Sequence, residues 1–173
     1  MTQSTFVTQS IDHLGIVAGI CHQIGLVETI DTFIGQTKRK VSVGQAVMAM
    51  ILNALGFVGR PLYLTPEFFS TKPVNLLIHP QMQASDFNDD SLGRALDALY
   101  EKGVTEAFAT VASKALTTYG VEHRFVHLDS TTFSLHGAYE ADSDDENAIQ
   151  VTHGYSRDYR PDLKQVVVHL LCS

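Results

Sequence analysis

The sequence lacks the short motifs that identify several enzyme classes. Its 173 residues contain no P-loop, GxGxxG, GxSxG or HExxH motif and no zinc-finger spacing. Nucleotide hydrolysis and serine hydrolase chemistry therefore have no motif support. Cysteine is scarce as well: Cys21 and Cys172 lie far apart and neither belongs to a CxxC pair, which is typical of reduced thiols in a cytoplasmic protein.

A targeting segment and long apolar runs are also missing. The first ten residues contain no basic segment followed by an apolar run, so no signal peptide is evident. The most apolar stretch, Val43–Val58, contains Gln45 and Asn53 and is shorter than the ~20 residues that cross a bilayer. A buried helix explains this stretch better than a membrane span.

Positive charge is limited, because 12 Lys and Arg stand against 19 Asp and Glu. Residues 1–121 carry eight basic and ten acidic side chains, and residues 122–173 carry four and nine. A separate DNA-binding domain is usually basic, since phosphate contacts provide most of its non-specific affinity. Strong duplex binding by this chain alone is therefore not expected, although basic residues gather at Lys38–Lys40.

Apolar residues are plentiful, at 45% of the chain against 18% charged residues. This composition supports a folded core and is not that of a disordered chain. The length fits one domain, or one domain and part of another.

The first part of the chain has helical periodicity. Ile16, Ile20 and Ile24 recur at helical spacing and predict an amphipathic helix over about 12–25. A second helix is expected from the N-cap Ser42 to about Phe57. It is apolar on almost every face, which predicts a central position in a helical bundle.

Three more helices are expected before Gly120. Thr65-Pro66-Glu67 is typical of an N-cap followed by a first-turn proline and acid. Residues 87–103 have caps at both ends and an apolar stripe formed by Leu92, Leu96 and Leu99. The last of these helices, over about 105–120, is expected to bury Phe108, Val111, Ala112, Ala115, Leu116 and Tyr119. The short link between the last two helices predicts an antiparallel helical hairpin.

After Gly120 the period changes from 3.6 to 2, which predicts strands. The expected strands are Arg124–Asp129, Thr131–Leu135, Ile149–His153 and Gln165–Leu171. Ala141–Glu146 is expected to be an acidic surface loop. Val166–Val168 is apolar on both faces, which predicts a layer on each side of the sheet. No helix follows to supply such a layer, so residues 122–173 are expected to be part of a larger domain.

Asp129 is the main candidate for chemistry. It ends an apolar strand segment on the same face as His127, and Mg²⁺ prefers carboxylate oxygens. Two or three such groups usually converge on the ion. His127 and Asp129 are also compatible with zinc or manganese, with His123, His136, His153 and His169 as further candidates. The structural alternative is an Asp at the end of a strand that makes local hydrogen bonds to hydroxyl groups.

The polar segment 152–165 is the candidate nucleic-acid surface. Tyr155, Arg157, Arg160 and Lys164 combine aromatic rings with positive charge, which suits phosphate contacts and base stacking. The alternative is a solvated turn organised by Pro161 and internal Arg–Asp pairs.

Three segments resemble bacterial insertion-sequence transposases of the DDE class: FNDDSLGRALDALYEKG (87–103), HLDSTTFSLHGAY (127–139) and VTHGYSRDYRPDLKQVVVHLL (151–171). Residues of about 11–121 are similar to the helical N-terminal domain of unknown function that precedes the catalytic core in one branch of this family. The resemblance implies an α+β chain with two parts: a helical domain over 1–121, and the first three or four antiparallel strands of an incomplete RNase H-like core over 122–173.

The resemblance also implies a mechanism. Asp129 matches the first metal-binding carboxylate of the DDE set, and the family uses two divalent ions, usually Mg²⁺, to transfer DNA strands. The second Asp and the Glu lie beyond this sequence. The chain alone is therefore expected to be inactive and to bind no metal tightly. The expected partners are DNA at transposon ends, a second copy of the chain, or a full-length transposase.

Two other functions remain open from the sequence. One is a non-catalytic DNA-binding or oligomerisation module that regulates a full-length transposase. The other is a metal-dependent hydrolase that uses His127, Asp129 and other histidines.

Overall fold

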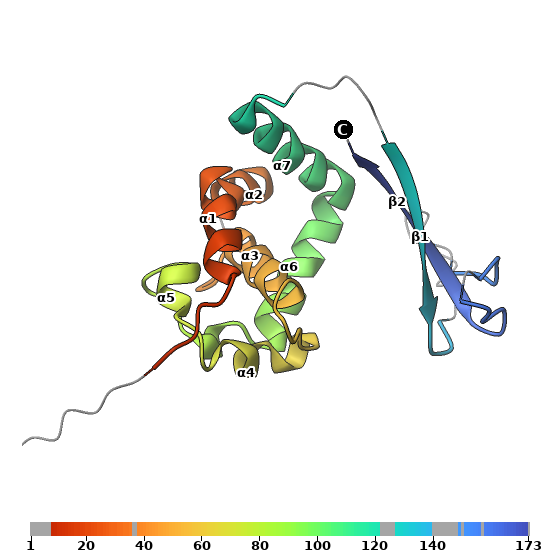
Figure 1. Ribbon diagram of the computed structural model, residues 1–173, viewed down its shortest axis with the longest axis horizontal. Coiled ribbons are helices and arrows are strands. Elements are labelled where there is room, and N and C mark those ends of the chain that lie inside the picture. The colour runs from red at the N-terminus through yellow and green to blue at the C-terminus, as the bar shows by residue number, and fades with distance from the viewer. Residues whose placement is uncertain are drawn as a thin grey trace, which may run out of the picture. The chain divides into compact units, whose positions relative to one another are not determined.

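The computed structural model describes residues 8–35, 38–121, 127–139, 149, 151–156 and 158–172. The chain divides into two compact units, Met1–Val121 and Glu122–Ser173. The first unit is helical and the second contains an antiparallel pair of strands (Figure 1). The α+β fold class that the sequence predicts is therefore confirmed.

The described part of the first unit contains seven α-helices. They are α1 (Leu14–Gln23), α2 (Leu26–Ile34), α3 (Val43–Ala54), α4 (Thr65–Phe69), α5 (Val74–Leu77), α6 (Asp89–Lys102) and α7 (Val104–Tyr119), with short 3-10 turns at Leu62–Leu64 and Ala84–Asp86. The sequence does not predict α2, α5 or the 3-10 turns. Gly25 adopts a left-handed conformation with φ 63°, which allows α2 to begin directly after α1 ends.

Helix α3 occupies the centre of the helical unit, as its apolar composition predicts. Ser42 Oγ accepts a hydrogen bond from the Gln45 N–H at 3.1 Å, and Gln45 Oε1 accepts one from the Ser42 N–H at 3.0 Å. This reciprocal cap fixes the start of the helix. The helix ends at Ala54, somewhat earlier than predicted. Its most deeply buried side chains, each with 0% exposure, are Ala46, Met48, Ala49 and Leu52.

Helices α2 and α3 approach closely at Gly44. A Cβ added to Gly44 would overlap the backbone of Val27. The Gly44 N–H donates to Asp31 Oδ1 at 2.7 Å, so a carboxylate from α2 satisfies an otherwise free amide in the first turn of α3. Glycine is therefore required by space at this position, although its helix propensity is low.

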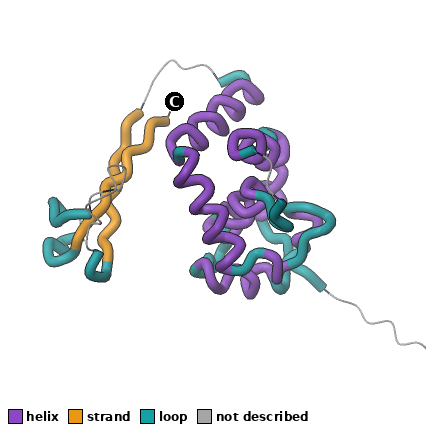
Figure 2. The backbone as a smooth tube through the Cα atoms, turned by 180° about the vertical axis from the view of Figure 1, so that it is seen from behind, coloured by secondary structure: helices purple, strands orange, loops and turns teal. Residues whose placement is uncertain are grey.

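Helix α6 begins as predicted, but α7 does not fold back along it. Asn88 Oδ1 accepts the Ser91 N–H at 2.9 Å and caps α6. Only Gly103 separates α6 from α7, whereas a reversal between helices needs about two to five residues. Figures 1 and 2 show α7 continuing at an angle beyond the end of α6, so the predicted antiparallel hairpin is wrong. Phe108 and Tyr119 on α7 are 61% and 51% exposed, not buried as predicted.

The predictions for the buried face of α1 and for the start of α4 also need correction. Ile16 and Ile20 on α1 are 70% and 46% exposed. The buried face of α1 consists instead of Leu14, Ala18 and Cys21, a second apolar stripe with equally good helical spacing. Thr65 is the first helical residue of α4 rather than its N-cap.

The helices of the first unit differ in length and apolar character, the two properties that decide whether a helix could cross a membrane. Among the described residues, no single helix is both long and apolar enough to cross a bilayer. Helices α1 and α2 meet the length and composition test only as a pair, and a bend of 53° separates them. Leu14 and Ala18 of this pair, with Leu26 and Ile30, lie in the buried core of the unit.

The second unit contains β1 (His127–Leu135) and β2 (Lys164–Cys172), which pair antiparallel with Asp129 opposite Leu170. The sequence predicts a break at Ser130, but Ser130 continues the ladder opposite His169. In place of a strand over 149–153, the described residues show one bridge between Thr152 and Gln165. The described part of this unit thus has two strands rather than the predicted three or four.

Both faces of the strand pair expose apolar side chains. Val167 and Val168 occupy opposite faces and remain 53% and 43% exposed. The described residues of this unit therefore do not provide the layer predicted on each face. A two-stranded hairpin is only marginally stable by itself, because it buries little apolar area.

The contact at Gly44 can be tested by adding a methyl group. Gly44→Ala is expected to lower the free energy of unfolding by about 1–3 kcal/mol, because the new Cβ forces α2 away from α3. Gly93→Ala in α6 is the matched control, since no atom lies within 4 Å of its added Cβ. It should be neutral or stabilising by up to about 1 kcal/mol in urea unfolding followed by circular dichroism. Equal effects of the two substitutions would contradict the close approach.

Candidate functional site

Asp129 lies on β1 within the regular ladder, and its side chain is exposed. Its Oδ1 accepts a hydrogen bond from the Ser130 N–H at 2.9 Å. The donor of this local hydrogen bond is a backbone N–H and not one of the hydroxyl groups of the structural alternative, and the bond occupies only part of the acceptor capacity of a carboxylate. Asp129 therefore keeps lone pairs directed to solvent from a position held by the strand.

Successive side chains of β1 point to opposite faces, and this decides which histidines share a face with Asp129. His127 is two residues away and shares the face of Asp129, as predicted. His169 pairs with Ser130 and lies on the opposite face, where its Nδ1 is hydrogen-bonded to Ser130 Oγ at 2.7 Å. The structure thus separates His169 from Asp129, and His123 lies outside the described residues.

A complete metal site is not present among the residues that the structure describes. No three side chains of His, Cys, Asp or Glu within that part of the chain come close enough to hold an ion together. Asp129 and His127 could supply two of the required ligands. Two-metal chemistry needs more carboxylates than this, so the described residues do not form a complete catalytic centre.

The predicted nucleic-acid surface at 152–165 is partly engaged in internal contacts. Arg160 donates to Asp162 through Nε at 2.9 Å and through a terminal nitrogen at 2.7 Å, the internal Arg–Asp pair of the alternative interpretation. Lys164 Nζ donates to the carbonyl groups of Ala138 and Tyr139 at 2.6 and 2.7 Å.

Tyr155 and Arg157 are the other two residues of this predicted surface. Tyr155 is 89% exposed, so its ring is accessible. Arg157 lies outside the described residues, as does the acidic segment 141–146. DNA binding by this loop therefore stays a prediction.

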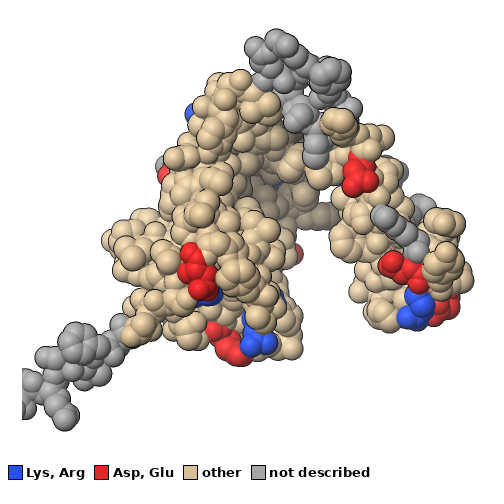
Figure 3. Space-filling view, viewed as in Figure 1, with Lys and Arg blue, Asp and Glu red and all other residues tan. Residues whose placement is uncertain are grey.

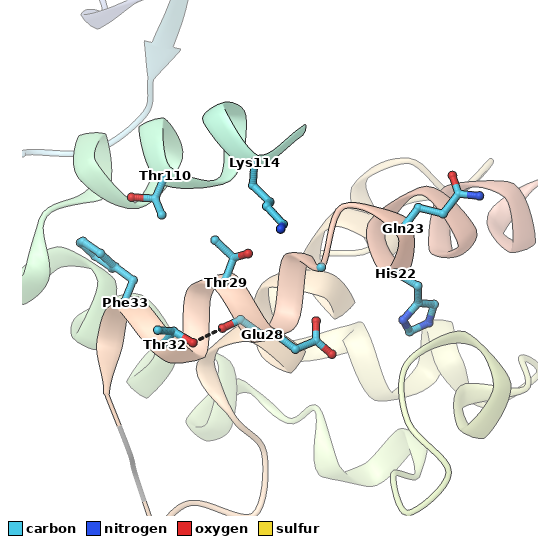
Figure 4. A pocket seen from close by; sticks show the side chains of 9 residues that line it. His22, Gln23, Glu28, Thr29, Thr32, Phe33, Thr110 and Lys114 are labelled. Carbon is cyan, nitrogen blue, oxygen red and sulfur yellow. Dashed lines mark hydrogen bonds between the residues drawn. The ribbon is translucent and has the colours of Figure 1, made fainter. Parts of the chain in front are cut away.

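A groove on the helical unit lies between α2 and α7 and has a volume of about 640 Å³. Figure 4 shows Thr29, Thr32 and Phe33 on α2 across from Thr110 and Lys114 on α7. Glu28 also lines the groove, so the wall carries both a carboxylate and an ammonium group. This mixture of charges does not select a particular class of ligand.

A second pocket, which we call the basic pocket, lies beside the first turns of α6 and has a volume of about 340 Å³. The residues that line it are Lys38, Arg39, Lys40, Val41, Ser91 and Arg94. The sequence singles out Lys38–Lys40 as a basic spot, but it gives no reason to add Arg94, which is 54 residues from Lys40. Only the packing of the chain before α3 against α6 brings these charges together.

On the face drawn in Figure 3, the Lys and Arg side chains lie mostly beside Asp and Glu side chains. The ion pairs Lys72–Asp12 at 3.2 Å and Arg60–Glu67 at 3.4 Å illustrate this pattern in the helical unit. The exposed Arg60–Glu67 pair contributes little to stability, but both pairs neutralise charge locally. The described residues on that face therefore form no broad basic surface.

Comparison with known proteins gives a family match for most of the helical unit. The model of the family described as a domain of unknown function (DUF4277) matches residues 6–113. The chain belongs to this family. No curated protein and no solved structure shows significant similarity to it.

The DUF4277 match covers the helical unit up to the third turn of α7, while β1 and β2 lie outside it. The sequence predicts a domain of unknown function over about 11–121, and the match shows one over 6–113. The family description assigns no activity, so the match does not identify a transposase.

The Arg160–Asp162 pair leads to a pH prediction. The hydrogen bond from Arg160 lowers the pKa of Asp162 from 3.8 to about 2. Because the folded-state pKa is depressed, the stabilisation is present above pH 3.8 and is lost as the pH falls through about 2. A carboxyl-carbon NMR titration of Arg160→Gln should move the Asp162 midpoint towards 3.8. Lys164→Gln is the control and should leave it unchanged, whereas an unchanged midpoint in Arg160→Gln would rule out this pair.

Proposed function

We propose that this DUF4277 chain is the N-terminal part of an insertion-sequence transposase of the DDE class. Residues 1–121 form its helical domain, and residues 122–173 contribute the first strands of an RNase H-like catalytic core. In this proposal Asp129 is the first of the metal-binding carboxylates. The compartment is the cytoplasm, and the substrate is DNA at the transposon ends.

The observation that carries the proposal is the position of Asp129. Its side chain is exposed on a regular strand, directly opposite Leu170 of the antiparallel neighbour. A strand holds a ligand with little conformational freedom, and this favours binding of an ion that demands defined geometry. The two segments that resemble transposases in this unit, 127–139 and 151–171, cover β1 and all of β2 except Cys172.

The proposal requires ligands from outside the described residues. Bound Mg²⁺ would supply the activation of water and of a DNA 3′-hydroxyl for attack on a phosphodiester. Asp129 would provide one of the carboxylates that hold the metal, and the other carboxylates would come from outside the described residues. The chain alone is therefore proposed to have no cleavage or strand-transfer activity.

A second function is favoured by the exposed apolar side chains of the strand pair. Phe133, Leu128 and Leu170 are 55%, 65% and 48% exposed. Apolar strands with free edges associate readily with other chains. A non-catalytic module that joins a full-length transposase, or a second copy of itself, would cover these side chains. Light scattering across a concentration series tests this alternative, and a strictly monomeric chain would contradict it.

Manganese binding tests the role of Asp129 in the full chain. Mn²⁺ should broaden the NMR signals of residues 127–131 at lower concentrations than other signals, because a paramagnetic ion relaxes nuclei near it. Asp129→Asn should abolish this selective broadening. Its stability should remain within about 0.5 kcal/mol of wild type, since an exposed side chain is changed.

Asp158→Asn is the matched control, because Asp158 is an exposed acid in the same unit. It should leave the broadening at 127–131 intact. Broadening that persists in Asp129→Asn would refute the assignment of the first carboxylate. Nicking of supercoiled plasmid by the purified chain with Mg²⁺ or Mn²⁺ would refute the requirement for outside ligands.

A further inference from the structure

The basic pocket collects positive charge that the proposed catalytic chemistry does not use. Residues 1–121 contain eight Lys and Arg, and four of them line this pocket. They come from the segment before α3 and from α6, which packs against α3. None of the described residues that line the pocket is acidic.

Three of the four cations are held in place by hydrogen bonds to the fold. Arg39 donates from a terminal nitrogen to the Arg94 carbonyl at 2.8 Å, which ties the segment before α3 to α6. Arg94 Nε donates to the Asp90 carbonyl at 3.0 Å. Lys40 Nζ donates to Asp86 Oδ1 at 2.6 Å. These bonds place the cationic groups before any ligand arrives, which lowers the entropic cost of binding.

The nearby acids compensate only part of this charge. Asp86 pairs with Lys40, and Asp90 lies 3.7 Å from Arg94. Lys38 has no ionic partner among the described residues, and the guanidinium of Arg39 bonds a neutral carbonyl. Lys38 and Arg39 are therefore uncompensated, and Arg94 is only loosely paired, because 3.7 Å exceeds hydrogen-bonding distance. These three cations remain for a ligand, and Ser91 adds a hydroxyl to the wall of the pocket.

An anion with several oxygens suits this arrangement. Guanidinium groups bind phosphate oxygens through paired N–H donors, and lysine adds a point charge. The volume of about 340 Å³ is at the lower end of the usual ~300–1,000 Å³ range of ligand pockets. A phosphodiester is therefore a better match than a large apolar ligand.

We propose that the basic pocket binds backbone phosphates of duplex DNA through Lys38, Arg39 and Arg94. The choice of DNA rests on the proposed transposase function, whereas the preference for a phosphate rests on the pocket itself. Binding at this pocket would place DNA on the helical unit by charge alone, without reading its sequence. The acidic balance of the chain predicts weak, strongly salt-dependent binding.

A double variant of the full chain tests this site. Lys38→Gln combined with Arg94→Gln should weaken binding to a short fluorescent duplex about tenfold at low salt. The slope of log affinity against log salt should fall by about one for each phosphate that the variant no longer neutralises. Lys40 is left unchanged because it pairs with Asp86. Fluorescence anisotropy measures both quantities, and circular dichroism melting verifies that the variant is folded.

Lys102→Gln is the matched control, since Lys102 is an exposed cation in the last turn of α6. It should bind DNA like wild type. Equal binding by all three proteins, or no binding by wild type at low salt, overturns the proposal. An NMR titration with inorganic phosphate distinguishes the source: shifts at Lys38 and Arg94 with phosphate but not with DNA overturn the choice of DNA. None of these outcomes depends on Asp129, so the metal test remains separate.

Discussion

The helical unit depends on the close approach of α2 to the first turn of α3. Gly44 leaves room for the backbone of Val27, and Asp31 accepts the Gly44 N–H at 2.7 Å. Because α3 is the central helix, its position sets where α6 packs, and α7 in turn lies against α2 and α6. The basic pocket depends on the packing of α3 against α6, since the segment that leads into α3 carries three of the pocket's four cations and α6 carries the fourth.

Elements with local signals can be predicted from the sequence, and elements that depend on tertiary contacts cannot. The caps Ser42 and Asn88 use side chains within three residues, so the starts of α3 and α6 are evident. Helix α2 begins directly after Gly25. The sequence does not predict this helix, because a glycine between apolar residues is as typical of a helix end as of a bend between two helices. Which stripe of α1 is buried depends on its neighbours, because both stripes have helical spacing.

The candidate sites show the same division. Alternation along residues 127–135 is enough to place Asp129 and His127 on one face of a strand. The internal pairing of Arg160 with Asp162 is expected only as an alternative, because a spacing of two is compatible with either a pair or two separate charges. Arg94 cannot be assigned to a site at all, since no local pattern relates it to Lys38 across 56 residues.

The face that carries Asp129 also carries Phe133 and Leu170, both largely exposed. Any protein layer that covers these apolar groups would also exclude water around the carboxylate and strengthen its attraction to a cation. In the proposed transposase, completing the sheet and loading the ion would then be thermodynamically linked events, each favouring the other. An incomplete core would then bind the ion more weakly than a completed one.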